Sequence, residues 1–372
     1  MYSINSEFVM NLDSEIVGLI RGEEENIKDS QFNDLALRMF EFQYNANKAY
    51  QKNCEKHGIK PGDISNWEEI PAVPMEVFKY ATPTCFPVEQ AVKHFITSGT
   101  SSPDKRGKLY LDQRSYEIYK ESMVSAFEKY TMPDLEKIRI LSLAPTPEMI
   151  PHMAMVHAMG LWMKKHGTPD SIYLVGKEGM DKKTFVGALK QAEKTGEPVF
   201  MIGASFNYVQ LFDGFGKQGL SFDLPEGSRT IDGGGYKGKS REVSKEEFYP
   251  MFTKIFGLRE DHCVNLLGMT EDGTNYYDNV LRNKVMGRVE PRYKPNHPWT
   301  RTIAIDPETL ERLPKGETGL LKYYDLANVG SVMVLRTDDL GYEIERGFEI
   351  TGRAKGATAR GCSMAAEEWI KP

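Results

Sequence analysis

The chain has 372 residues, 40% hydrophobic and 27% charged, which excludes a disordered, collagen-like or disulfide-scaffold protein and leaves room for two or three domains, or one large one. Its 47 basic and 53 acidic residues give a net charge of −6, so no overall field would attract nucleic acid or an anionic membrane, and neither is expected as a partner.

A cytoplasmic location without a membrane span is expected from two features. The longest mostly apolar run, residues 153–163, is shorter than the about 20 residues that a transmembrane helix needs, and the N-terminus lacks the basic and apolar regions of a signal peptide. The four cysteines form no Cys-x-x-Cys pair, so reduced thiols fit the pattern better than a disulfide framework or a structural zinc site.

The predicted elements start with helices, because apolar residues recur at helical spacing within the first 60 residues until Gly58 and Pro61 end the pattern. A proline-rich stretch over residues 70–87 then indicates an extended surface crossing. Further along, apolar runs alternate with helical patterns; the runs are residues 92–96, 138–143, 172–175, 199–202 and 264–267, and the helices are residues 115–130, 149–165, 182–194, 206–216 and 245–256. This alternation predicts an α/β protein with a largely parallel sheet.

The pattern changes after residue 295. Short apolar runs over residues 302–305, 319–323 and 332–335 are separated by turn-rich segments, which predicts a small antiparallel sheet or barrel. We therefore expect three parts, which are an α/β body over residues 1–295, a small β subdomain over residues 296–350 and a C-terminal stub over residues 351–372 that carries Cys362.

The strongest local signal for chemistry is the hydroxyl-rich segment over residues 97–103, Thr-Ser-Gly-Thr-Ser-Ser-Pro, which directly follows an apolar run. Hydroxyl groups and backbone N–H groups around a glycine form a nest suited to phosphate, and Lys105, Arg106 and Lys108 add positive charge. The segment lacks the Walker A spacing. An ordinary turn rich in serine and threonine explains the composition equally well.

A second segment, residues 232–238, reads Asp-Gly-Gly-Gly-Tyr-Lys-Gly and fits the spacing G-x-G-x-x-G. Its surroundings argue against a Rossmann dinucleotide site, because little strand precedes it and neither an amphipathic helix nor a suitably spaced acid follows. A flexible loop that lets a ligand approach the backbone closely is the better interpretation.

A third segment, residues 265–273, ends an apolar strand with a glycine, a hydroxyl and two acids. Ligands of α/β sheets bind beyond the carboxyl ends of strands, so Glu271 or Asp272 could hold Mg²⁺, a cation that prefers oxygen ligands. The alternative is a helix that is capped by Thr270 and favoured by the two acids in its first turn. The magnesium site and the helix cap are compatible interpretations.

Two C-terminal segments add weaker signals. Residues 336–341 place two acids at the end of a strand, where they could accept hydrogen bonds from sugar hydroxyls or form a plain turn. Cys362 follows a glycine and has Arg353, Lys355 and Arg360 nearby in sequence. Positive charge and a helix N-terminus lower a thiol pKa and favour a nucleophilic thiolate, whereas most cysteines are small buried hydrophobes.

In this order, the segments resemble the motifs of the adenylate-forming superfamily of acyl-CoA synthetases, luciferases and adenylation domains. The order of five motifs is far more specific than any single one. Within the superfamily, the chain most resembles the LuxE-type acyl-protein synthetases of the bacterial luminescence fatty-acid reductase system. The matching segments are residues 97–103 (T-S-G-T-S/T-G-x-P), 233–235 (the glycine-rich adenine loop), 265–271 (N-x-Y-G-x-T-E), 337–340 (T-G-D-L) and 352–356 (G-R-x-K-D).

The resemblance implies an adenylate-forming α/β body with mostly parallel sheets flanked by helices, plus a small antiparallel sheet or barrel. It implies two steps, in which a fatty or other carboxylic acid attacks ATP to form acyl-AMP and a cysteine thiolate then takes the acyl group as a thioester. ATP and Mg²⁺ are the implied cofactors, and an acyl-accepting reductase subunit is an implied partner.

The same resemblance assigns roles residue by residue. The β- and γ-phosphates would be held by Thr97, Ser98, Gly99, Thr100 and Ser101, and the adenine and acyl-carbonyl pocket would be lined by Gly233, Gly234 and Gly235. Thr270 would touch the α-phosphate, and Glu271 would ligate Mg²⁺. Asp339, with Arg353 beside it, would bind the ribose, and Cys362 would accept the acyl group.

The sequence also departs from the superfamily pattern. Leu267 stands where an aromatic usually stacks on adenine, Ser102 replaces the second glycine of the phosphate loop, and Asp338 and Gly356 replace a glycine and an aspartate. The chain stops soon after residue 356, so the mobile C-terminal domain with its catalytic lysine is expected to be missing. Two alternatives follow, a ligase that acylates coenzyme A or a carrier protein, and a nucleotide-binding regulatory protein without catalysis.

Overall fold

The computed structural model describes residues 6–22, 27–97, 106–236 and 238–354, and the chain forms two compact units. The first unit combines residues 1–126, 269–274 and 294–372, and the second combines residues 127–268 and 275–293. This division differs from the predicted boundary near residue 295, because residues 269–274 and the C-terminal sheet pack with the N-terminal part of the chain.

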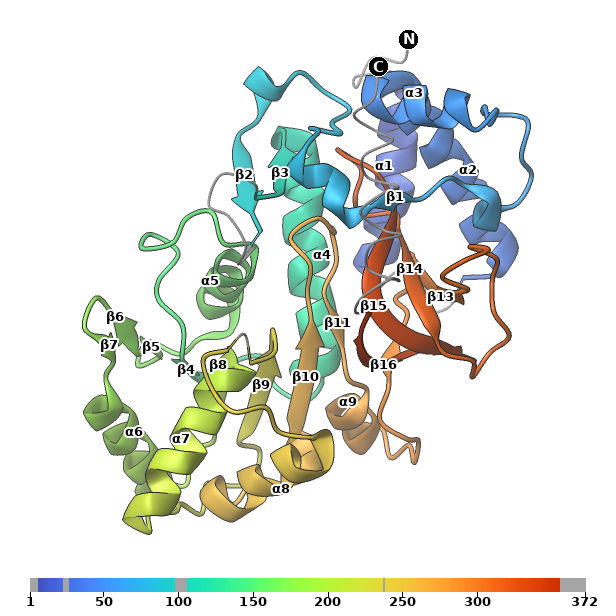
Figure 1. Ribbon diagram of the computed structural model, residues 1–372. Helices are drawn as coiled ribbons and strands as arrows, with labels where there is room; N and C mark the ends of the chain where they lie inside the picture. Colours follow the sequence, from blue (N-terminus) through green and yellow to red (C-terminus); the bar gives the residue numbers. More distant parts are fainter. Residues whose placement is uncertain (1–5, 23–26, 98–105, 237, 355–372) are drawn as a thin grey trace. The chain divides into compact units, whose positions relative to one another are not determined.

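The second unit contains a six-stranded sheet with the order β11-β10-β9-β8-β4-β5 (Figure 1). Neighbouring strands from β5 to β10 are parallel and β11 is antiparallel to β10, which confirms the predicted, largely parallel sheet. A short hairpin of β6 and β7 lies outside this sheet. The strands are β4 (Arg139–Ser142), β5 (Ile172–Tyr173), β6 (Val175–Gly176), β7 (Gly179–Met180), β8 (Val199–Ala204), β9 (Arg229–Gly233), β10 (Cys263–Leu267) and β11 (Tyr276–Tyr277).

Three helices of the second unit share one hydrophobic core with the sheet. Phe185, Phe212 and Phe252 come from α6, α7 and α8, and they cluster with Leu141 and Met201 of β4 and β8. Burying each such side chain contributes roughly 1.5–3 kcal/mol. The helices are α5 (Ala154–His166), α6 (Lys182–Thr195), α7 (Ser205–Gln218), α8 (Lys245–Phe256) and α9 (Val280–Val285).

Stacked aromatic side chains pack against the other face of this sheet. The Phe127 ring stacks on Trp162 of α5 with ring centroids 4.5 Å apart, and on Phe200 of β8 at 5.7 Å. Because β8 is buried on both faces, its residues 199–203 are all buried, as expected for a central parallel strand.

The first unit is built on an antiparallel sheet with the order β12-β16-β15-β14-β13, which confirms the small antiparallel sheet predicted after residue 295. β1 (Val73–Pro74) also joins it, parallel to β15 through Val73 and Leu335. Val73 is buried, so this part of the proline-rich stretch is a strand rather than the expected surface crossing. The other strands are β12 (Lys294–Pro295), β13 (Thr300–Ile305), β14 (Gly319–Asp325), β15 (Val334–Ile344) and β16 (Gly347–Arg353).

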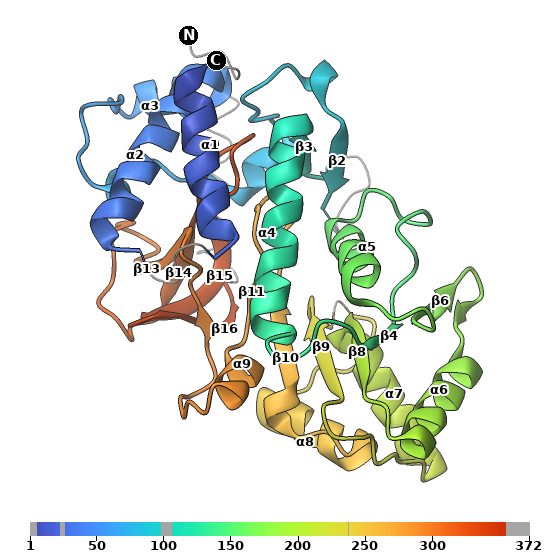
Figure 2. The same cartoon turned by 180° about the vertical axis from the view of Figure 1, so that it is seen from behind.

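Helices and a separate hairpin complete the first unit. α1 (Glu7–Ile20) and α2 (Asp29–Ala46) lie side by side (Figure 2), followed by α3 (Lys48–Lys56). The hairpin pairs β2 (Lys93–Ile96) with β3 (Lys108–Leu111), and α4 (Gln113–Thr131) follows it. The predicted strand over residues 92–96 therefore exists but belongs to this hairpin.

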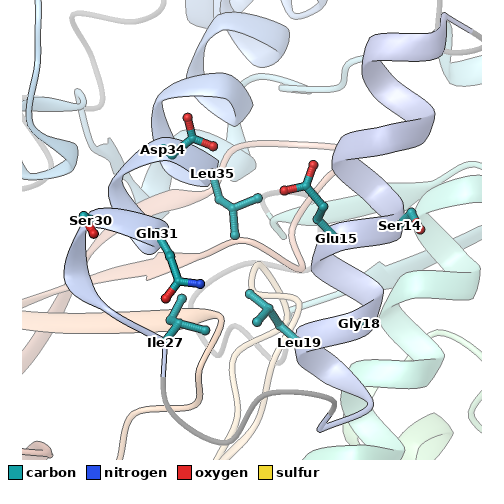
Figure 3. Close-up of a pocket in the computed structure, with 9 residues that line it drawn as sticks. All are labelled: Ser14, Glu15, Gly18, Leu19, Ile27, Ser30, Gln31, Asp34 and Leu35. Atoms are coloured by element: carbon teal, nitrogen blue, oxygen red, sulfur yellow. The ribbon is translucent and has the colours of Figure 1, made fainter.

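A pocket of about 630 Å³ opens between α1 and α2 (Figure 3). None of the predicted site residues lines it. Its two carboxylates, Glu15 and Asp34, both pair with Arg38, at 2.7 and 2.9 Å. Among the described residues that line it, both carboxylates are therefore paired, and none of them belongs to the predicted chemistry.

Lys322 is a destabilising feature of the first unit. It lies on β14 opposite Arg336 of β15, and its Nζ donates a hydrogen bond to the backbone carbonyl of Glu68 at 3.1 Å. Loss of water around the ammonium lowers the pKa of Lys322 from 10.5 to about 8, and the charge of Arg336 acts in the same direction while that of Glu68 opposes it.

Replacing this lysine should therefore stabilise the protein. We expect Lys322→Met to raise the free energy of unfolding at neutral pH by roughly 1–3 kcal/mol, since each unit of pKa shift corresponds to about 1.4 kcal/mol. Below pH 8 the folded and unfolded chains both keep the proton, so the full cost is present; between pH 8 and 10.5 only the unfolded chain keeps it, and the cost fades.

Urea unfolding of the wild type and Lys322→Met at about pH 7 and about pH 9.5 measures this effect. The variant should be the more stable protein at the lower pH, and the difference should shrink at the higher pH. A variant less stable than the wild type at neutral pH would show that the hydrogen bond to Glu68 outweighs the burial of the charge.

Candidate active site

The segment 269–274 follows β10 and carries the predicted Thr270 and Glu271. It forms a turn, and the next helix, α9, begins only at Val280. The alternative that Thr270 caps a helix is therefore wrong. The chain instead passes close to β14 and the turn after it, where a Cβ on Gly273 would lie only 3.0 Å from backbone atoms of Ala327 and Asn328.

Thr97 and Glu271 both contact the space around Gly107. A Cβ added at Gly107 would meet Thr97 Cγ2 at 3.0 Å and Glu271 Oε1 at 3.3 Å. The Thr97 backbone N–H also donates to the Gly107 carbonyl at 2.9 Å, next to the β2–β3 hairpin. The hydroxyl-rich segment therefore begins beside Glu271, as the hypothesis of a shared phosphate site requires.

The Glu271 carboxyl is buried and only 6% exposed. Burial raises the pKa of Glu271 to about 7, and the negative charge of Glu76 acts in the same direction. The positive charges of Lys79 and Arg353 oppose this shift. Among the described residues, the hydrogen bond to this carboxyl comes from its own backbone N–H and no other side chain donates to it.

Asp339 and Arg353 face each other on β15 and β16. Arg353 Nε donates to Asp339 Oδ1 at 3.0 Å. Burial raises the pKa of Asp339, while Arg353 acts against that rise. Because Arg353 also influences Glu271, the first unit brings Thr97, Glu271, Asp339 and Arg353 into one neighbourhood from four separate segments.

Two charged residues of this neighbourhood were not identified from the sequence. Glu76 and Lys79 lie on the 3₁₀ turn η2 (Met75–Lys79), directly after β1. Burial raises the pKa of Glu76, and the nearby Asp338 carboxyl, which shares a hydrogen bond with it, raises it further. Asp338 occupies the position where the superfamily motif has glycine. Glu76 was not identified from the sequence because the proline-rich composition around it is also typical of an ordinary loop.

The three predicted glycines lie in the second unit. Gly233 ends β9 next to β10, and a Cβ there would come within 2.7 Å of the Leu266 carbonyl oxygen, so only glycine fits. Gly234 and Gly235 follow with φ angles of 75° and 62°. Asp232 is held by Ser205 Oγ and Asn265 Nδ2, each at 2.9 Å. The placement of these glycines beside Glu271 stays a prediction.

Five predicted residues, Ser98, Gly99, Thr100, Ser101 and Cys362, lie outside the described residues. The cysteines that the structure describes, Cys54, Cys85 and Cys263, are free but buried. Burial raises the pKa of Cys54 and Cys85 to about 12 and raises that of Cys263 well above its ordinary value. None of these three is therefore a reactive thiolate.

The described part of the chain also lacks two features. No group of three or more histidine, cysteine, aspartate or glutamate side chains there could hold a metal ion alone. No helix in the same residues is both long and apolar enough to cross a bilayer.

Comparison with known proteins points to one family. The family model described as "Acyl-protein synthetase, LuxE" matches residues 8–370. A "Long-chain-fatty-acid--luciferin-component ligase" of Vibrio harveyi is 22% identical over 336 residues, covering 88% of this chain and 84% of the relative. The protein of the same name from Aliivibrio fischeri is 23% identical over 355 residues, covering 92% of this chain and 88% of the relative.

Solved structures show the same fold at low sequence identity. An open conformation of 2-hydroxyisobutyryl-CoA ligase, in complex with 2-HIB-AMP and CoA, has a TM-score of 0.62 and 12% identity over 88% of this chain and 71% of that chain. The same ligase in its thioesterification state has a TM-score of 0.60 and 14% identity, over 88% and 69% of the two chains. These likenesses establish the adenylate-forming fold.

Proposed function

Because this chain belongs to the LuxE family of acyl-protein synthetases, an enzyme family, we propose that it activates a long-chain fatty acid with ATP and transfers the acyl group to a cysteine thiol. The observation that carries the proposal is the grouping of Thr97, Glu271, Asp339 and Arg353 within the first unit. Four sequence-distant motifs meet there, as one nucleotide site requires.

The proposed reaction has two steps. A carboxylate oxygen of the fatty acid attacks the α-phosphorus of ATP, the bond to the β-phosphate oxygen breaks, and pyrophosphate leaves with acyl-AMP remaining. A cysteine thiolate then attacks the acyl carbonyl carbon, the acyl–phosphate bond breaks, and AMP leaves as the thioester forms. The thiol proton is lost to solvent or a base before the attack.

The residues of the first unit have distinct roles in this proposal. Backbone N–H groups and hydroxyls from Thr97 to Ser101 hold the β- and γ-phosphates, and Thr270 contacts the α-phosphate. The Asp339 carboxylate, kept in place by Arg353, accepts hydrogen bonds from the ribose hydroxyls. Gly233, Gly234 and Gly235, which belong to the second unit, are proposed to line the adenine and acyl-carbonyl pocket.

Glu271 fits a magnesium ion that is bound together with the nucleotide. A buried carboxyl next to Glu76, to which no side chain among the described residues donates, offers hard oxygen and negative charge. One protein carboxylate is typical of Mg²⁺ sites in which phosphates and water supply the remaining ligands. When bound, such an ion neutralises charge that develops on the phosphate oxygens.

Two further parts of the proposal concern the cellular location of the enzyme and the protein that accepts its acyl group. We place the enzyme in the cytoplasm, where thiols stay reduced, consistent with the free cysteines. A reductase subunit would take the acyl group from the enzyme. Both parts are independent of the activation chemistry.

ATP–pyrophosphate exchange with acids of graded chain length tests the proposal. We expect labelled pyrophosphate to enter ATP only when a carboxylic acid is present, with the fastest exchange for long-chain fatty acids. Exchange with no acid of the series would overturn the proposal in favour of a nucleotide-binding protein without catalysis. Transfer to coenzyme A without an acylated enzyme would instead favour a coenzyme A ligase.

A further inference from the structure

The turn between β14 and β15, residues 326–333, places a buried amide against the backbone of Glu271. Asn328 is only 3% exposed. Its Nδ2 donates hydrogen bonds to the carbonyl oxygens of Glu271 and Val332, both at 2.9 Å. The backbone N–H of Asn328 donates to the Asp325 carbonyl at 3.2 Å, so both the backbone and the side chain of Asn328 are held by hydrogen bonds within the turn.

This turn is itself anchored to other parts of the first unit. Gln43 of α2 donates Nε2 to the Asn328 carbonyl at 2.9 Å and accepts through Oε1 from the Met333 N–H, also at 2.9 Å. Ser331 Oγ donates to the Pro83 carbonyl at 2.7 Å. The turn therefore cannot move without breaking several buried hydrogen bonds.

Close packing holds the Glu271 segment on the same turn. A Cβ at Gly273 would lie 3.0 Å from Asp325 Oδ2 as well as from the turn backbone. Asp325 and Asp272 are both 1% exposed, and their carboxyls share a hydrogen bond. Asp325 Oδ1 also accepts from the Ala327 N–H at 2.8 Å. The backbone on both sides of Glu271 is thereby fixed.

The Glu271 carboxyl accepts a hydrogen bond from its own backbone N–H, so its support comes from the backbone. No side chain among the described residues donates a hydrogen bond to its carboxyl, so the direction of the carboxyl depends on where the backbone is held. We propose that Asn328 is a positioning residue, which aims the Glu271 carboxylate at the cation of the nucleotide by fixing the Glu271 carbonyl. The inference rests on the proposed function and adds a residue that acts through the backbone of Glu271.

Asn328→Ala and Ser331→Ala form a matched pair for the test. Asn328→Ala removes two buried side-chain hydrogen bonds of the turn and Ser331→Ala removes one, but only Asn328 contacts Glu271. Two quantities are measured for each variant, the rate of acid-dependent ATP–pyrophosphate exchange and the increase in Tm on adding ATP with Mg²⁺ or with EDTA. The second readout needs no turnover.

We expect Asn328→Ala to slow exchange by about 10- to 100-fold, the range typical of residues that orient a metal ligand. The part of the Tm increase that depends on Mg²⁺ should largely disappear. Ser331→Ala should also lower the Tm of the unliganded protein while keeping both functions. Asn328→Leu, which has a similar size but no hydrogen-bond donor, should repeat the loss if the alanine variant does not fold.

Equal losses in Asn328→Ala and Ser331→Ala would overturn the inference, because the effect would then be general instability. Unchanged exchange and an unchanged Mg²⁺-dependent Tm increase in folded Asn328→Ala or Asn328→Leu would overturn it as well. A failure of the proposed function itself is distinguishable, since the wild type would then show no exchange with any acid.

Discussion

Replacing Cys362 with serine should abolish formation of the acyl-enzyme. After incubation with ATP and a labelled long-chain fatty acid, the wild type should carry label that hydroxylamine releases at neutral pH, as expected of a thioester. Cys362→Ser should carry only background label, because a serine hydroxyl without an adjacent base is a weak nucleophile. Acid-dependent pyrophosphate exchange, which precedes the thiol step, should continue in the variant.

The buried thiols provide the matched control. Cys54 is fully buried, and burial raises the pKa of its thiol to about 12, so it holds almost no thiolate at neutral pH. Cys54→Ala should therefore keep the hydroxylamine-labile label. Label that persists on Cys362→Ser and disappears from Cys54→Ala would reverse the assignment of the acyl acceptor.

Replacing Glu271 with glutamine should slow pyrophosphate exchange by about 100-fold or more. The proposed cation contributes several kcal/mol of charge stabilisation, and a neutral amide is a poor ligand for it. Exchange at saturating ATP and Mg²⁺ measures the loss. Glu345→Gln is a suitable control, because this exposed carboxylate only pairs with Lys315 at the surface.

The stability of Glu271→Gln separates a binding defect from unfolding. Since burial raises the pKa of Glu271 to about 7, the folded protein already bears the cost of enclosing a group that prefers to be neutral. A glutamine of the same size should leave the Tm unchanged or raise it. A stable variant with wild-type exchange would remove Glu271 from the proposed site.

Local patterns in the sequence were sufficient for the main architecture. Alternating apolar runs and helical periods identified β4, β8 and β10 with the helices between them, because burial on both faces of a central strand requires continuous apolar residues. Turn-rich spacing after residue 295 likewise predicted the antiparallel strands β13 to β15. The order of short motifs was enough to name the family, since each motif depends on residue types within a few positions.

Other features depend on contacts between residues far apart in the chain. Val73 enters a sheet with Leu335, and Thr270 starts a turn instead of a helix because Gly273 packs against Ala327. Neither neighbour can be inferred from the few residues on either side. In both cases tertiary packing decides the local structure and overrides the preference of the nearby residues.

The electrostatic environment of the candidate site also depends on residues far apart in the chain. Burial and the charge of Glu76 raise the pKa of Glu271, while Lys79 and Arg353 oppose the rise, and these three residues come from other segments of the chain. The support from Asn328 spans 57 positions. Residue types near each motif told us which chemistry to expect, whereas burial and charge environment are sums over spatial neighbours, so they exist only once the chain has folded.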